Sequence, residues 1–309
     1  MDKVVNVLQC IVPIFVTVFL GVQAKRRQIV TQEQVKGLQQ FVMQFGLPCV
    51  LFTSCLQADI STEAVSTFAL VVPFMVASTL WAFRLGRKKY PVHNLPMLFC
   101  AQESGMLGIP LFIILFGSAQ AYRMGILDIA QMPTAFPTIA ILSASAGQKL
   151  STKELLQKVV RSPLLIMSML GLVLNLSGIA AWLDGYGITG IITETTSFLS
   201  QPVSALMIFC VGYNFSMAKG HRKAIFQISA LHFAWTAGFG IVIQLLLLLL
   251  PNVDPLTRWS VLLYTTLPAS YLSPSLGRSE EDYALASGVC SILTVASLAV
   301  FCVMAVIVA

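Results

Sequence analysis

The stretch AQESGMLGIPL, residues 101–111, holds the feature that decides how this chain folds. It lies inside a long apolar run, yet it carries the carboxylate Glu103, the glycines Gly105 and Gly108, and Pro110. Proline lacks an amide hydrogen and clashes with the carbonyl four residues before it, while glycine adds backbone freedom. The stretch therefore predicts a break at 104–110 in a helix that is otherwise apolar enough to cross a membrane.

The composition of the whole chain sets the fold class. Of 309 residues, 57% are hydrophobic and 10% are charged, whereas a soluble domain has about 25% charged residues. We therefore predict an all-α polytopic membrane protein. The net charge of +6 lies in short basic clusters between apolar runs, a pattern typical of topology control and not of nucleic-acid binding.

Motifs for catalysis and metal binding are missing from the sequence. The seven cysteines all lie in apolar stretches without a CxxC pair, and the three histidines are scattered. There is no GxSxG, no HExxH and no P-loop, so the sequence predicts no catalytic residue, no metal and no cofactor. The expectation is a protein that is not an enzyme.

Hydropathy predicts ten membrane-spanning segments of roughly 20 residues each. They fall near 4–23, 35–56, 66–83, 95–116, 123–146, 162–183, 196–217, 225–250, 259–276 and 283–308. Sixteen of the 19 lysines and arginines lie in alternate loops, and the other three are Lys3, Arg123 and Arg258. The positive-inside rule then puts the richer loops in the cytoplasm and both termini outside.

Matched prolines and glycines indicate an internal repeat. Pro13 and Gly21 recur as Pro163 and Gly171, Pro48 as Pro202, and Pro110 as Pro268, at offsets of 150, 154 and 158 residues. We predict one five-helix half over 1–146, a cytoplasmic linker over 147–162 and a second half over 163–309. An odd number of spans inverts the second half, which is typical of secondary transporters.

The second break is LPASYLSPSLG, residues 267–277, in the place that corresponds to the first. Broken helices in corresponding positions of two halves point to a transport site, where freed amides and half-helix ends can hold an anion. The candidate substrate-binding residues are Glu103, Ser104, Gly105, Gly108, Pro110, Pro268, Ser270, Tyr271 and Ser273.

Glu103 is also the first candidate for binding a coupling ion. A charge at the bilayer centre costs roughly 2.5–3.5 kcal/mol, so the side chain must face a cavity or a partner. It can exchange a proton or coordinate Na⁺, and it would repel an anionic substrate unless protonated or cation-bound. The alternative is a neutral carboxylic acid bonded to a freed carbonyl, with a structural role only.

Other polar residues in apolar segments are weaker candidates. Asp128, with Gln131 on the same helix face, is a second ion-coupling candidate, and its alternative is a solvated position at the external interface. His232 is predicted to be a hydrogen-bonded packing residue, with a proton relay as the alternative. The secondary candidates, which also fit helix-packing roles, are Pro48, Gln131, Gln201, Pro202 and Asn214.

Several of these stretches resemble the auxin efflux carrier family, whose bacterial members are described as malate or malonate permeases. They are GLPCVLF (46–52), SGMLGIPL (104–111), SPLLIMSMLGLVLNLSGI (162–179), LPASYLSPSLG (267–277) and ALASGVCSILTVAS (284–297). The resemblance implies ten helices in two inverted five-helix repeats, with broken helices four and nine crossing near Pro110 and Pro268. It also implies a transport domain that moves against a scaffold of segments one, two, six and seven. A homodimer is compatible with it.

Two departures from the family pattern affect the expected site. This chain has Glu103 where the family often has asparagine, and it has Pro274 and no Tyr-Gly pair after the second break. A substrate therefore cannot be transferred from named relatives.

The function predicted is a secondary transporter in the cytoplasmic membrane. It would move a small organic anion, a carboxylate, coupled to H⁺ or Na⁺ or driven by the substrate's own gradient. The alternatives are a Na⁺/bile-acid-type symporter, a membrane receptor or sensor without flux, and an intramembrane enzyme. Substrate, direction, coupling ion and oligomeric state stay open.

Overall fold

The computed structural model describes residues 2–58, 62–88, 92–145, 154, 157, 160–216, 221–250 and 253–308. Within these residues all regular secondary structure is helical. Extended backbone pairs at a single antiparallel bridge, between Gln102 and Ala269. The prediction of an all-helical chain is confirmed. The helices of the first half are α1 (Asp2–Arg26), α2 (Gln32–Phe41), η1 (Val42–Gly46), α3 (Leu47–Leu56), α4 (Thr62–Lys88), α5 (Met97–Cys100), η2 (Ser104–Gly108), α6 (Ile109–Phe116), η3 (Ser118–Gln120) and α7 (Tyr122–Ser145). Those of the second half are α9 (Pro163–Leu176), α10 (Ile179–Asp184), α11 (Ile188–Ser200), α12 (Val203–Asn214), α13 (Arg222–Leu248), α14 (Pro255–Thr266), η4 (Ser273–Leu276) and α15 (Glu280–Val308).

Six helical stretches in the described residues are long and apolar enough to cross a membrane. They are Val4–Arg26, Ser66–Gly86, Ser118–Ala144, Ile188–Asn214, Arg222–Leu248 and Glu280–Val308. Shorter apolar helices cover Ser104–Phe116 and Pro163–Leu176. These lengths support a multi-pass membrane protein, while the count of ten spans and the inverted repeat stay predictions.

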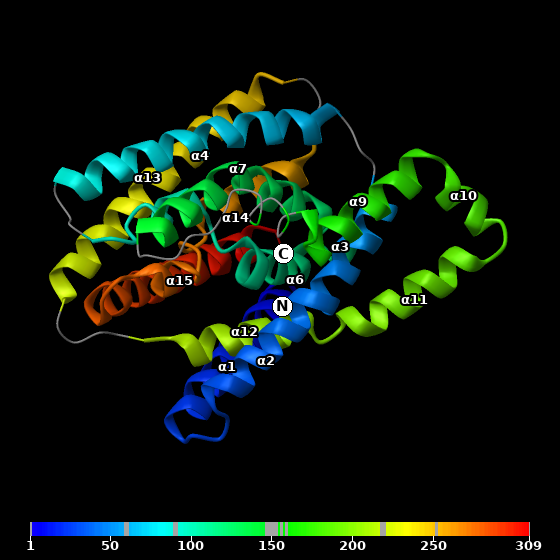
Figure 1. The fold of residues 1–309 in the computed structure, drawn as a ribbon. Helices are drawn as coiled ribbons and strands as arrows, with labels where there is room; N and C mark the ends of the chain where they lie inside the picture. The colour runs from blue at the N-terminus through cyan, green and yellow to red at the C-terminus, as the bar shows by residue number, and fades with distance from the viewer. Residues whose placement is uncertain are drawn as a thin grey trace.

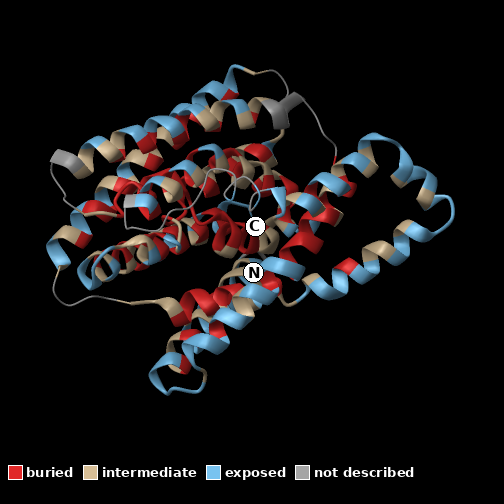
Figure 2. Ribbon diagram, viewed as in Figure 1, coloured by how far each residue is buried: buried red, intermediate tan, exposed pale blue. Residues whose placement is uncertain are grey.

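The interior lies between α4, α6, α7, α13, α14 and α15, where buried residues concentrate (Figure 2). Helices α10 and α11 project from the rest of the chain (Figure 1) and expose large apolar side chains. Phe198 on α11, for example, is 75% exposed. Such a surface suits contact with lipid and not with water.

Two pairs of helices approach closely at glycines. A Cβ atom on Gly212 of α12 would overlap the carbonyl oxygen of Val18 on α1, and one on Gly21 would overlap that of Phe209. In the same way, a Cβ atom on Gly171 of α9 would overlap the carbonyl oxygen of Phe52 on α3. Small residues let membrane helices pack backbone against backbone. The first predicted span therefore packs on the seventh, and the sixth packs on the second.

The structure corrects the ends of three predicted segments. The helix predicted over 162–183 ends at Leu176, because Gly178 adopts a left-handed conformation with φ of +75°. The segment predicted over 196–217 begins earlier, at Ile188, and a turn at Gln201 and Pro202 interrupts it. The segment predicted over 259–276 is an α-helix only to Thr266, and its second part is the single 3₁₀ turn η4. The predicted linker 147–162 lies outside the described residues except for 154, 157 and 160–162.

Candidate functional site

The two predicted interruptions cross each other and pair through their backbones. The amide nitrogen of Glu103 donates to the carbonyl oxygen of Pro268 at 2.8 Å, and that of Ser270 donates to Ala101 at 3.0 Å. The bridge between Gln102 and Ala269 lies between these two bonds. Non-helical backbone at membrane depth needs protein partners, and here each interruption supplies partners for the other.

Local sequence explains where each interruption begins. The residue before a proline is driven toward extended backbone, and Leu267 before Pro268 has φ −65° and ψ 155° and ends α14. A Cβ atom on Gly108 would lie 2.6 Å from Leu267 Cδ1 and 2.8 Å from Met124 Cε. Both atoms are the ends of flexible side chains, so glycine lets the two segments approach without moving either side chain.

The first break lies three residues earlier than predicted, and this also moves the crossing away from Pro110. The non-helical residues are 101–103, whereas 104–108 form the π-helical turn η2. Pro110 is the second residue of α6, which follows η2 without a gap in a helical stretch from Ser104 to Phe116. It therefore lies inside the second half of the span and does not make the break itself.

Glu103 joins the two interruptions through its side chain. Its Oε2 accepts from the amide nitrogen of Tyr271 at 2.6 Å, and its Oε1 accepts from that of Met106 at 3.2 Å. The side chain is 8% exposed. Both partners are donors, an arrangement that suits a carboxylate at the start of a helical turn. Two of the amides that were predicted to hold a passenger anion thus hold Glu103.

Asp128 on α7 belongs to the same cluster. Ser104 Oγ donates to its Oδ1, and Gln131 Nε2 donates to that oxygen at 2.9 Å and to Ser104 Oγ at 3.1 Å. Gln131 Oε1 accepts from the amide nitrogen of Gln102 at 2.7 Å and from the Tyr264 hydroxyl at 3.0 Å. The half-buried Asp128 therefore contacts the first break, which favours the site over the solvated alternative.

The remaining residues predicted on the second break differ in their surroundings. The Tyr271 hydroxyl shares a hydrogen bond of 2.8 Å with Thr294 Oγ1 on α15. Ser270 Oγ accepts from the amide of Leu272 at 3.3 Å. Ser273 Oγ is buried and has no hydrogen-bond partner within the described residues. The second break thus presents one free hydroxyl.

Four secondary candidates make contacts that lie away from the crossing. Pro48 is buried in α3, which packs on α9 and α11. Gln201 and Pro202 form the turn between α11 and α12, and Gln201 is exposed. Asn214 Oδ1 accepts from Gln32 Nε2 at 3.3 Å. In contrast, Gln131 lies at the crossing.

Two residues were not understood from sequence. Gln102 is 2% exposed and lies in the bridge itself, and its position beside Glu103 in an apolar run was the available signal. His232 was predicted to be hydrogen-bonded, and this was wrong. Both of its ring nitrogens are buried without a partner in the described part of the chain. The centroid of its ring lies 5.2 Å from the centroid of the Phe99 ring, because α13 places it among apolar side chains.

The charge at the crossing is acidic. Among the described residues, no ion pair involves Glu103 or Asp128, and no group of three or more His, Cys, Asp or Glu side chains could hold a metal ion. Arg123 at the start of α7 instead pairs with Asp254 at the start of α14. The crossing thus combines two carboxylates with peptide dipoles and amide side chains.

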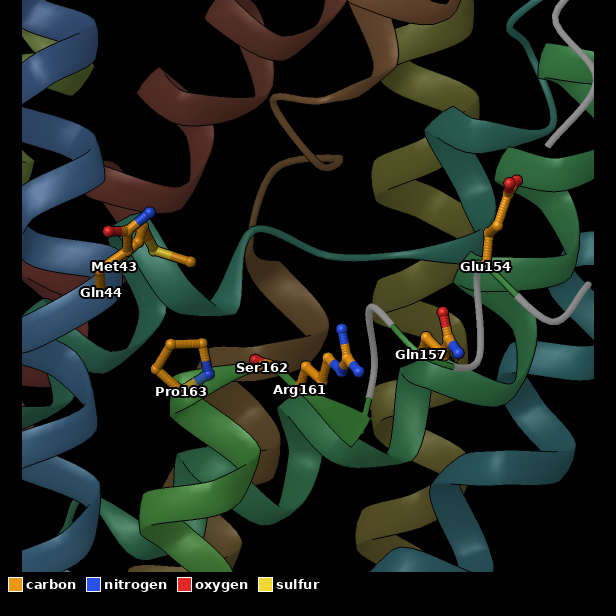
Figure 3. A pocket seen from close by; sticks show the side chains of 7 residues that line it. All are labelled: Met43, Gln44, Glu154, Gln157, Arg161, Ser162 and Pro163. Atoms are coloured by element: carbon orange, nitrogen blue, oxygen red, sulfur yellow. The ribbon is translucent and has the colours of Figure 1, made fainter. Parts of the chain in front are cut away.

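A separate pocket of about 780 Å³ lies beside the start of α9. Figure 3 shows its lining residues, which are Met43, Gln44, Glu154, Gln157, Arg161, Ser162 and Pro163. None of the predicted site residues lines it. It is therefore distinct from the crossing.

Comparison with known proteins finds similarity to membrane transporters. Residues 6–142 match the family model described as a membrane transport protein. This stretch is similar to that family. The resemblance to auxin efflux carrier permeases is thereby confirmed for it, and the matched stretch includes the first break, Asp128 and Gln131. The second break lies beyond it.

A relative described as an uncharacterized transporter, from Methanothermobacter thermautotrophicus, is 26% identical over 212 residues. The alignment covers 66% of this chain and 66% of the relative, which is just under two thirds of the relative's own length. Both comparisons support a membrane transporter.

Removing the Asp128 carboxylate should destabilise the crossing. In Asp128→Leu, Ser104 Oγ and Gln131 Nε2 lose their shared acceptor, and a buried unsatisfied polar group costs about 1–3 kcal/mol. We expect a Tm in detergent that is lower by several degrees. Asp128→Asn keeps an acceptor oxygen and should recover most of the loss. Equal Tm values for Asp128→Leu and wild type would show that the cluster adds no stability.

Proposed function

We propose that this protein is a secondary transporter that moves a small carboxylate anion across the cytoplasmic membrane, coupled to H⁺ or Na⁺. One observation carries the proposal. The carboxylate of Glu103 lies at the crossing of two broken segments and accepts from an amide on each of them. Paired breaks of this kind are the usual place of a transport site.

Coupling follows from charge at the crossing. A passenger carboxylate is repelled by ionised Glu103, and more weakly by Asp128, which contacts the same break through Ser104. Binding of H⁺ or Na⁺ by Glu103 removes the repulsion and releases its amide donors. The passenger therefore binds best together with a cation. This links the two fluxes.

Alternating access is supported by burial and by the helix crossings. Gln102 and Glu103 are 2% and 8% exposed, so a passenger reaches them only after the surrounding helices move. The glycine contacts of α1 with α12 and of α3 with α9 suit a rigid scaffold. Predicted span one packs on span seven, and span six, the counterpart of span one in the second half, packs on span two. This symmetric pairing also supports the inverted repeat over 1–146 and 163–309. Placement of both termini outside belongs to the same proposal.

Transport in proteoliposomes tests this function. We expect labelled malonate or malate to accumulate against its gradient when an inward H⁺ or Na⁺ gradient is imposed, and to leak out after an ionophore is added. Stabilisation by these ligands without any flux would favour a receptor. Flux that does not respond to either gradient would support a carrier and reject coupling to H⁺ or Na⁺.

A Na⁺/bile-acid-type symporter is the second candidate. Ser104 Oγ and Asp128 Oδ1 lie together beside Gln131, and hard cations prefer oxygen ligands of this type. A Na⁺ titration of uptake at fixed pH separates the two cases. Saturable activation by Na⁺ supports the symporter, and activation by acid alone supports H⁺ coupling.

A further inference from the structure

Gln102 combines a fixed backbone with a side chain that has no partner. Its amide nitrogen donates to Gln131 Oε1, and its backbone pairs with Ala269 across the two interruptions. The side chain is buried, and neither Nε2 nor Oε1 has a hydrogen-bond partner within the described residues. Buried polar groups are nearly always paired, so such an exception requires an explanation.

The two carboxylates nearest in sequence or through Gln131 make their hydrogen bonds to other donors among the described residues. The Glu103 carboxylate accepts from Met106 and Tyr271. The Asp128 carboxylate accepts from Ser104 and Gln131. The Gln102 amide is therefore the free donor and acceptor of the first break.

We propose that the Gln102 side chain determines specificity by binding a carboxyl group of the passenger in its protonated form. This inference rests on the proposed function and deepens it. A primary amide offers one donor and one acceptor side by side, and a protonated carboxyl group offers the complementary pair.

The electrostatics of the crossing favour the protonated form. An ionised carboxylate would satisfy Nε2 but would leave Oε1 facing one of its own oxygens, which has no hydrogen to donate. No ion pair in the described residues places a basic side chain against either acid. A neutral acid avoids this repulsion and pairs both atoms of the amide.

Malonate and its half-amide, malonamate, form the test pair. The carboxamide of malonamate cannot ionise, yet it presents the same donor and acceptor as a protonated carboxyl group. With wild-type protein in proteoliposomes, we expect malonamate to compete with labelled malonate with a Ki within about tenfold of the malonate KM. We expect Gln102→Met, which keeps the length but has no polar atom, to raise both constants at least about tenfold with little change in kcat.

Two further variants control for a structural effect. Ser229→Ala removes another buried hydroxyl without a partner, on α13 and outside the crossing, and should leave both constants unchanged. Gln102→Glu keeps the size and adds a charge, so it should bind malonate less well even if Gln102→Met does not fold. Constants that stay at wild-type values in the folded Gln102 variants would overturn the inference. If neither malonate, malate, succinate nor acetate stabilises or crosses with wild-type protein at any pH, the proposed function itself fails.

Discussion

Glu103→Gln is expected to abolish the response of transport to pH and Na⁺ gradients while exchange of the passenger continues. Glutamine keeps an acceptor oxygen for one of the two amide donors, from Met106 or Tyr271, but it cannot be charged and so cannot bind the coupling ion. Without the charge, the passenger no longer needs a cation to bind. Gradient-driven accumulation should fall at least about tenfold, whereas counterflow should change by only about two- or threefold.

The measurement compares two fluxes in the same proteoliposomes. Accumulation is driven by an imposed gradient, and counterflow is driven by unlabelled passenger inside the vesicle. Glu281→Gln is the matched control, because that exposed carboxylate lies near His221 at the ends of α13 and α15, outside the crossing. Unchanged coupling in Glu103→Gln would reject the role of Glu103, and Asp128 would become the group to test.

Gly212→Ala is expected to cause one of the largest losses of stability among glycine-to-alanine changes in the described residues. The added Cβ atom would overlap the carbonyl oxygen of Val18, which is backbone and cannot move aside as a side chain does. Helix α1 must then separate from α12. Overpacking of this kind typically costs about 1–3 kcal/mol and sometimes more. Thermal unfolding in detergent should show a clearly lower Tm.

Gly238→Ala provides a control with the opposite sign. Gly238 lies inside α13, and a Cβ atom built there meets no heavy atom within 4 Å. Alanine is favoured over glycine within a helix by about 0.5–1 kcal/mol, so the Tm should rise slightly. A similar Tm for Gly212→Ala and Gly238→Ala would show that α1 and α12 do not pack as described.

The segment 101–111 shows what local sequence could predict. The apolar residues around Glu103, Gly108 and Pro110 were sufficient to predict a broken membrane helix. Hydropathy and the missing amide hydrogen of proline act over a few residues, so they can be recognised locally. The place of the break was predicted less well. Pro110 lies within a helical stretch that begins at Ser104, so only the partners of residues 101–103 located the interruption.

Asp128 and His232 show where local patterns could not decide. Each is one polar residue in an apolar helix, and either could face a partner, a cavity or an apolar neighbour. Packing of α7 against the first break gave Asp128 its contacts, and packing of α13 placed the His232 ring beside Phe99. Neither neighbour is close in sequence.

The sequence by itself determined an all-helical chain of membrane-spanning character, with two interruptions and a carboxylate beside the first. Those features arise from hydrophobicity and backbone chemistry within single segments. Only the tertiary structure decided that the interruptions pair with each other, that Glu103 accepts from both of them, and that the Gln102 amide is left free. The reason is distance along the chain: Glu103 and Tyr271 are 168 residues apart, and no local preference specifies which distant backbone satisfies a broken helix.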